Sequence, residues 1–175
     1  MRGGYLCLLA AIGALAAPAA VRAGQAAVDR GKYLVTLSGC SDCHTPGGML
    51  GASDKNRLFG GSDVGFGIQG VGVFVGPNLT PDKETGLGAW TDAQIVAAMT
   101  KGKRPDGRTL SGVMPFEALS HLTPGDAQAI VAYLRSLPPV KNKAPGPFGP
   151  NDKTSLMVSV IVPGEVYSAL PSPPK

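Results

Sequence analysis

Cysteine and histidine are scarce in this chain. Its 175 residues include three cysteines and two histidines. A structural zinc site uses four nitrogen or sulfur ligands, so a zinc ion would need nearly all of these side chains at once, namely Cys40, Cys43, His44 and His121. The sequence also lacks an internal repeat, which argues against two copies of one functional unit.

Long apolar runs are missing except at the N-terminus. The run from Tyr5 to Ala20 is shorter than the roughly 20 residues that span a bilayer. It follows a positively charged start, and Val21-Arg22-Ala23 matches the small-x-small pattern of a cleavage site. We therefore expect residues 1–23 to be a secretory signal peptide, with an uncleaved anchor as the alternative. Cleavage removes Cys7, and both remaining cysteines belong to one motif, so no disulfide is left to assign.

A strong excess of charge of one sign is also absent. The sequence has 16 basic and 12 acidic residues, and two of the basic ones, Arg2 and Arg22, lie in the predicted signal peptide. The remaining excess of 14 over 12 gives no indication of nucleic-acid binding. One local cluster surrounds Asp106 and consists of Lys101, Lys103, Arg104 and Arg108. It is either a docking patch for a transient partner or a solvated turn.

The residues Cys40-Ser41-Asp42-Cys43-His44 form the most informative pattern in the chain. Cys-x-x-Cys-His is the motif for covalent attachment of a c-type haem. The two thiols add to the porphyrin vinyl groups, and the adjacent histidine ligates the iron. A thioredoxin-like redox pair would need a βαβ context, which this segment lacks. We predict one covalent haem, attached through Cys40 and Cys43, in a protein that works outside the cytoplasm.

Three segments carry helix signals, which indicates an all-α fold. The first covers residues 26–38, just before the motif. A capping box at Thr91 opens the second, which Gly102 ends. Thr123 and Pro124 open the third as N-cap and first helical residue, and Pro138 prevents its continuation. The apolar positions on these helices are Val28, Leu34, Val35, Leu37, Ile95, Val96, Met99, Ala127, Ile130, Val131 and Leu134.

Two segments fall outside this helical pattern. The glycine-rich stretch 47–76 predicts a short ribbon, in which Val71–Val75 pairs with Leu58-Phe59 or with Gly65–Ile68, or else an ordinary surface loop. Its glycines would let the backbone lie close to a flat cofactor. Residues 141–175 contain seven prolines and one apolar island, from Leu156 to Val162. We expect them to form an extended tail over the domain or over a partner.

The sixth ligand of the predicted iron has several candidates. Met114 lies in an irregular loop between the second and third helices, and Pro115 stops a helix from passing through it. Met99 falls on the inner face of a helix, and Met49 and Met157 lie in other loops or the tail. His121 and an open site are the remaining alternatives. Histidine and methionine together would raise the potential and leave no position for a substrate.

With these features the chain resembles the class I cytochrome c family over residues 28–140. The segments on which the resemblance rests occur in the same order as in that family. They are Cys40–His44, Gly76-Pro77-Asn78-Leu79, Met114-Pro115 and Tyr133–Pro138. It is also similar to the modules in cytochrome c subunits of bacterial membrane-bound alcohol and sugar-acid dehydrogenases. That similarity rests on Pro77–Asp82, Thr85–Thr91 and Arg104–Arg108.

The resemblance implies a role for each matching residue. His44 would be the proximal ligand and Met114 the distal one, with the Pro77 carbonyl accepting a hydrogen bond from His44. Trp90 would pack on the porphyrin or donate to a propionate, or be a plain core aromatic. The dehydrogenase subunits usually carry three haem motifs, whereas this chain has one. The long loop between His44 and Pro77 and the tail are further departures.

These expectations combine into one hypothesis. Residues 24–140 form a monohaem cytochrome c domain with three or more helices around the haem, a short β-ribbon and the extended tail 141–175. The protein is a periplasmic electron carrier rather than an enzyme, and exchanges electrons with a dehydrogenase, an oxidase or a membrane complex. It has no nucleic-acid partner and no membrane span once the signal is removed. The alternatives are a small haem oxidoreductase with a labile sixth position and an obligate haem subunit of a dehydrogenase complex.

Overall fold

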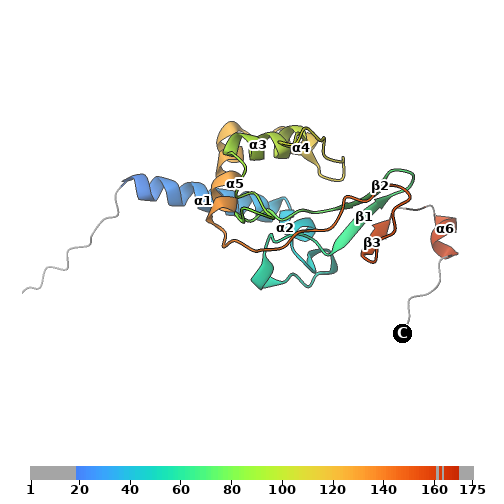
Figure 1. Ribbon diagram of the computed structural model, residues 1–175. Coiled ribbons are helices and arrows are strands. Elements are labelled where there is room, and N and C mark those ends of the chain that lie inside the picture. Colours follow the sequence, from blue (N-terminus) through green and yellow to red (C-terminus); the bar gives the residue numbers. More distant parts are fainter. Residues whose placement is uncertain (1–18, 161, 163, 170–175) are drawn as a thin grey trace, which may run out of the picture.

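The computed structural model describes residues 19–160, 162 and 164–169. Within them the chain forms six α-helices, two short 3-10 turns and three strands (Figure 1). In chain order these are α1 (Ala19–Leu37), α2 (Cys40–His44), η1 (Gly48–Leu50), η2 (Lys55–Arg57), β1 (Val64–Ile68), β2 (Gly72–Val75), α3 (Asp92–Lys101), α4 (Phe116–Leu119), α5 (Pro124–Ser136), β3 (Met157–Val160) and α6 (Gly164–Ser168).

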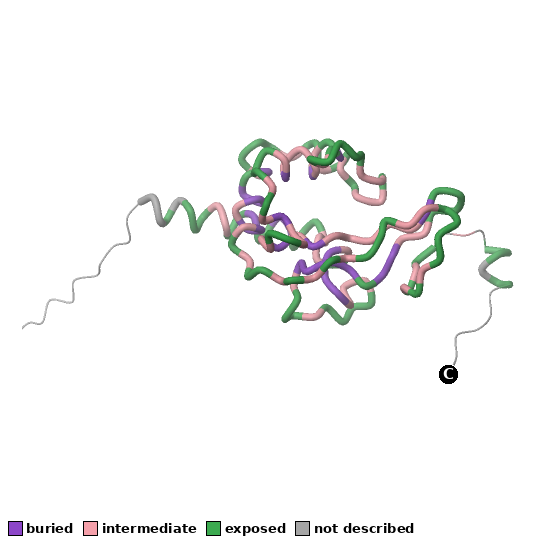
Figure 2. The backbone as a smooth tube through the Cα atoms, in the orientation of Figure 1, coloured by how far each residue is buried: buried purple, intermediate pink, exposed green. Residues whose placement is uncertain are grey.

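Helices α1 and α5 cross at the centre of the core, where the buried residues gather in Figure 2. They approach closely because Gly31 has no side chain, and a Cβ there would lie 1.9 Å from the Ala129 carbonyl oxygen. An ion pair of 2.8 Å between Arg30 and Asp126 joins the same two helices at the surface. The buried core is made of Leu34, Val35, Phe59, Leu87, Ile95, Met99, Ala127, Ile130, Val131, Tyr133 and Leu134.

The predicted helix ends at α3 and α5 are confirmed. Thr91 accepts the Gln94 backbone N–H, and the Gln94 side chain accepts the Thr91 N–H, which completes the capping box. Gly102 ends α3 in the left-handed conformation, with φ of 64°. Thr123 caps α5, whose first residue is Pro124. These helix ends could be predicted from the local sequence because the capping residues form hydrogen bonds with backbone groups that a helix end leaves without partners.

The first helix differs from the prediction in two respects. It starts at Ala19, so its first turns run through the cleavage position expected after residue 23, while residues 1–18 of the predicted signal peptide lie outside the described chain. Leu37 is 71% exposed although it was grouped with the apolar face. At 100° per residue it lies about 110° around the helix from the centre of the Leu34–Val35 face, which explains its exposure.

A small sheet replaces the predicted two-stranded ribbon. Strands β1 and β2 pair antiparallel, so the partner of β2 is the segment around Gly65–Ile68 and not Leu58-Phe59. Strand β3, from the C-terminal tail, adds to the other edge of β1 in parallel, which gives the order β2-β1-β3. The description of residues 141–175 as only an extended tail is therefore incomplete. The apolar segment of this tail forms a strand because the outer edge of β1 has backbone N–H and C=O groups available for pairing.

Figure 1 shows how the shorter helices and the sheet are arranged on the two sides of the molecule. Helices α3 and α4 lie on one side, and α2 and the start of the sheet lie on the other. The Phe116 ring covers the end of α3, since a Cβ on Gly102 would lie 3.0 Å from that ring. Among the described residues, no helix has both the length and the apolar composition required to cross a membrane.

Candidate functional site

Helix α2 presents the two cysteines on one helical turn. It begins after Gly39, which adopts a left-handed conformation with φ of 63° and turns the chain sharply out of α1. Cys40 and Cys43 are three positions apart, so their side chains project from the same face of the helix. Both are free and half-buried, and burial raises the pKa of each thiol. The helix thus presents both cysteine side chains together on one face.

His44 ends α2 and is buried, with 6% of its surface exposed. Its Nδ1 lies 2.8 Å from the Pro77 carbonyl oxygen, which is the hydrogen bond that the resemblance implied. A carbonyl can only accept, so Nδ1 must carry the proton and Nε2 keeps its free lone pair. Burial lowers the pKa of His44, and the bond to Pro77 opposes that effect. The imidazole is therefore held neutral, in the form that ligates a metal ion.

Gly76 allows the segment with Pro77 to pass directly against α2. A Cβ at Gly76 would lie 1.8 Å from the Cys43 carbonyl oxygen, which no side chain could tolerate. The N–H of Ser62 donates to the Gly76 carbonyl at 2.8 Å, and the N–H of Gly61 donates to the His44 carbonyl at 2.9 Å. Glycine at position 76 is thus required by the close packing against α2, while the predicted approach of glycine backbone to a flat cofactor stays a prediction.

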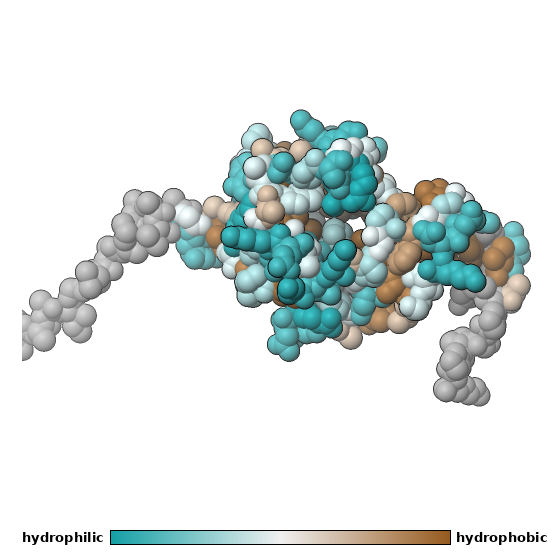
Figure 3. All heavy atoms as spheres, in the orientation of Figure 1, coloured by the Kyte–Doolittle hydropathy of each residue, from teal (hydrophilic) through white to brown (hydrophobic). Residues whose placement is uncertain are grey.

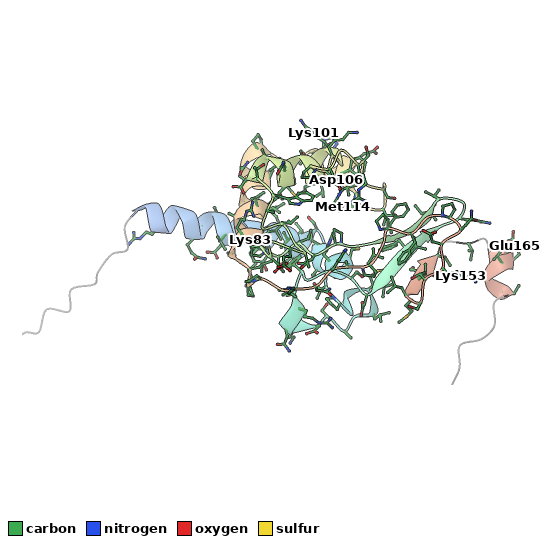
Figure 4. The ribbon with its side chains drawn as sticks, viewed as in Figure 1. Lys83, Lys101, Asp106, Met114, Lys153 and Glu165 are labelled. Carbon is green, nitrogen blue, oxygen red and sulfur yellow. The ribbon has the colours of Figure 1, made fainter. Side chains whose placement is uncertain are left out.

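Met114 lies on the turn that precedes α4 and is half-buried. Its N–H donates to the Ser111 carbonyl at 3.0 Å, which closes the turn. Together with Phe116 and neighbouring residues it lines a hollow of about 340 Å³. Figure 3 shows an opening between the α3–α4 side and the strands, and Figure 4 places Met114 at the edge of that opening. A thioether in this position borders open space and is not locked in the core.

Trp90 packs against the core and is also covered by a cation. The Arg104 guanidinium carbon lies 5.0 Å from the centroid of the Trp90 ring. Arg135, on α5, donates to the Trp90 and Leu87 carbonyls and pairs with Asp92 at 3.0 Å. These contacts fix the turn that carries Trp90. They agree with the core interpretation, while the propionate contact stays a prediction.

The predicted basic cluster is partly neutralised from within. Asp106 pairs with Arg104 at 3.2 Å and with Arg108 at 2.9 Å. The backbone N–H of Arg108, followed by the two guanidinium groups, lowers the pKa of Asp106 to about 2. Lys101 and Lys103 are exposed, and Figure 4 shows Lys101 and Asp106 on the α3–α4 side. Both interpretations of the cluster stay open.

The other candidate ligands are placed differently from Met114. Met99 is buried in the core with 9% exposed, Met157 is 59% exposed on β3, and Met49 lies in η1. His121 is exposed on the turn between α4 and α5. In the described part of the chain, no group of three or more His, Cys, Asp or Glu side chains is arranged to hold a metal ion, so the zinc alternative gains no support.

A buried polar network beside Pro77 was not predicted from the sequence. Asn78 and Thr80 are 2% and 0% exposed, and the Asn78 side-chain oxygen accepts both the N–H and the hydroxyl of Thr80. The Asn78 side-chain nitrogen lies within hydrogen-bond distance of the carbonyls of Val140 and Asn142. The segment Pro77–Asp82 carried the resemblance, but its polar side chains gave no sign of a partner more than 60 residues away.

The residues present fit a covalently attached haem. The thiols of Cys40 and Cys43 are free and on one face, and the lone pair of the His44 Nε2 atom is available for iron. The Met114 side chain lines the hollow on the turn before α4, and Figure 4 places Met114 at the edge of the opening seen in Figure 3. The hydrogen bond from His44 to the Pro77 carbonyl has the orientation that the resemblance implied, while haem attachment through Cys40 and Cys43 stays a prediction.

Comparisons with known proteins identify the family of this chain. The sequence profile described as cytochrome c matches residues 28–138. The chain is 34% identical over 145 residues to the cytochrome c subunit of the quinone alcohol dehydrogenase of Gluconobacter oxydans, covering 79% of this chain and 28% of the relative. It is 31% identical over 137 residues to the fructose dehydrogenase cytochrome subunit of Gluconobacter japonicus, covering 75% of this chain and 26% of the relative.

A third relative is the gluconate 2-dehydrogenase cytochrome c subunit of Pantoea cypripedii, which is 29% identical over 136 residues, covering 76% of this chain and 28% of the relative. The match thus spans less than a third of the length of each of these three proteins. The predicted resemblance to cytochrome c subunits of dehydrogenases is confirmed. The chain belongs to the cytochrome c family.

Proposed function

We propose that this protein transfers single electrons through one haem bound covalently to Cys40 and Cys43, with His44 and Met114 as the iron ligands. The observation that carries the proposal is the 2.8 Å contact between His44 Nδ1 and the Pro77 carbonyl, which leaves Nε2 for the metal. When bound, the haem supplies one-electron redox chemistry. The chain's own part is to hold both ligands still and to exclude water, so that little rearranges when the charge changes.

Met114 is the proposed second ligand because its thioether sulfur can bind iron and its side chain lines a hollow. It is half-buried and lines the hollow on the turn before α4, whereas Met99 is held in the core and Met157 is exposed on β3. A filled sixth position leaves no place for a substrate, so we propose an electron carrier and not an enzyme.

A dehydrogenase is the proposed partner. Relatives are named as cytochrome subunits of alcohol and fructose dehydrogenases, which supports this class of donor. We further propose a periplasmic location reached through the signal peptide 1–23, with the haem domain in residues 24–140. Whether the protein acts as a free carrier or as a fixed subunit of such a complex is decided by co-purification with the donor.

The variant Met114→Ala tests the ligand assignment. Removal of the thioether should lower the midpoint potential, because methionine ligation favours the reduced iron. Met157→Ala is the matched control, since that methionine is exposed on β3 and should leave the potential unchanged. Potentiometric titration of protein matured in a host that attaches c-type haem gives the comparison. Equal potentials for the wild type and Met114→Ala would remove Met114 from the site.

A further inference from the structure

The segment that follows α5 is tied to the segment that carries Pro77. We call residues 138–142 the strap. The Asn78 side-chain nitrogen lies 2.6 Å from the Val140 carbonyl oxygen and 3.2 Å from that of Asn142. In return, the Val140 N–H donates to the Thr80 hydroxyl at 3.0 Å. A second tie comes from the Asn142 side chain, which donates to the Gly60 carbonyl at 2.7 Å.

The orientation of the Asn78 amide is determined by its neighbours. Its side-chain oxygen accepts the Thr80 N–H at 2.9 Å, and a backbone N–H can only donate. Its side-chain nitrogen must therefore face the Val140 carbonyl, which can only accept. Asn78 is 2% exposed, so water cannot substitute for these partners. The side chain bridges two segments separated by 62 residues in a single arrangement.

The bridged residue is next to the acceptor that holds His44. The carbonyl of Pro77 and the N–H of Asn78 belong to one planar peptide unit. Fixing Asn78 through its side chain therefore fixes the direction in which the Pro77 carbonyl points. That carbonyl is the partner of the His44 Nδ1 atom at 2.8 Å. The Leu79 N–H, which donates to the Phe59 carbonyl at 2.8 Å, holds the same segment one residue further along.

We propose that Asn78 is a positioning residue for the iron ligand His44, and that the strap holds Asn78 in place. This inference rests on the proposed function, in which His44 binds the haem iron. A well-directed hydrogen bond at Nδ1 makes an imidazole a stronger electron donor to a metal. The strap thus links the end of the folded domain to the donor strength of its buried ligand.

The variant Asn78→Ala tests the proposal in the haem-loaded protein. The Pro77 carbonyl loses its fixed direction, so the proton on His44 Nδ1 should exchange with solvent about tenfold faster, the ratio that corresponds to about 1.4 kcal/mol. The midpoint potential should rise, because a weaker donor stabilises oxidised iron less. Exchange is followed by NMR of the reduced protein, and the potential by titration. Thr80→Val, which keeps its shape but cannot donate to Asn78, is the second variant and applies if Asn78→Ala does not fold.

Thr123→Ala is the control for general loss of stability. It removes the N-cap of α5, which accepts the Asp126 N–H at 3.1 Å, and it has no tie to Pro77. Exchange and potential that change in the Asn78 and Thr80 variants but not in this control support the proposal. If they change no more than in the control, Asn78 has only a structural role and the proposal is overturned. A wild-type protein without a low-spin haem spectrum overturns the proposed function itself, and the inference with it.

Discussion

At the scale of single residues, His44 and Pro77 illustrate what a motif can and cannot predict. The motif named both cysteines and the histidine because the chemistry of attachment requires these residue types at this spacing. The family pattern added Pro77, and the structure contains the expected hydrogen bond. Asn78 was missed, because its partners at Val140 and Asn142 are backbone carbonyls. Backbone acceptors leave no trace in residue identity, so only the fold reveals them.

Asp106 gives a prediction on pH at the same scale. Its pKa falls to about 2 because the Arg108 N–H and two guanidinium groups favour the ionised form. A depressed folded-state pKa stabilises the fold fully above the ordinary value of 3.8, and this contribution is lost as the pH falls towards 2. The difference in melting temperature between the wild type and Asp106→Asn should therefore be constant above about pH 5 and shrink below pH 4.

Thermal unfolding across that pH range measures this difference, with Asp152→Asn as a control outside the cluster. Because Asp106 is exposed, the effect is small and screened by salt. A difference that grows as the pH falls would contradict the assigned contacts. The same variant would leave Arg104 and Arg108 without their shared anion and so make the cluster more positive.

At the scale of elements, helix ends were predicted better than strand pairing. The capping box at Thr91 and the N-cap at Thr123 are local patterns, and both are present. The partner of β2 was left open between two segments, and β3 was not expected at all. Strand β3 forms because the edge of β1, far away in the sequence, offers it a pairing partner. The four residues Met157–Val160 alone contain too little information to predict that pairing.

The substitution Thr91→Ala tests the capping box of α3. It removes the hydroxyl that accepts the Gln94 N–H at 3.2 Å and should lower the free energy of unfolding by about 1 kcal/mol. Thr36→Ala, on the exposed surface of α1, is a matched control with an expected change within about 0.5 kcal/mol. Chemical denaturation provides both values. An equal effect of the two substitutions would mean that the cap contributes nothing particular to α3.

At the scale of the whole molecule, the strap is packed together with the part of the chain that carries Pro77, although it follows the last long helix. Helix α5 ends at Ser136, but Val140 and Asn142 still contact the centre of the site through Asn78. Strand β3 comes later and adds to the sheet, which lies away from the α1–α5 core in Figure 1. A domain boundary near residue 140, as expected from composition, would therefore cut through the contacts that hold the segment with Pro77.

Two truncations test this division. A chain that ends after Lys143 keeps the strap, so it should retain the haem spectrum and potential and lose on the order of 1 kcal/mol with the β1–β3 pairing. A chain that ends after Leu137 leaves the buried Asn78 without its carbonyl partners, which costs about 1–3 kcal/mol more. Denaturation and spectra of both proteins supply the comparison. Equal stability of the two would show that the strap has no structural role.

The central claim is that His44 and Met114 fill both axial positions of one covalently bound haem. The most direct test is the absorption spectrum of the mature protein, reduced with dithionite, before and after addition of carbon monoxide. We predict a low-spin c-type spectrum that carbon monoxide does not change, because no iron position is free for it. A spectrum that shifts on addition of the gas would mean an open or labile sixth position, and would contradict the assignment of an electron carrier.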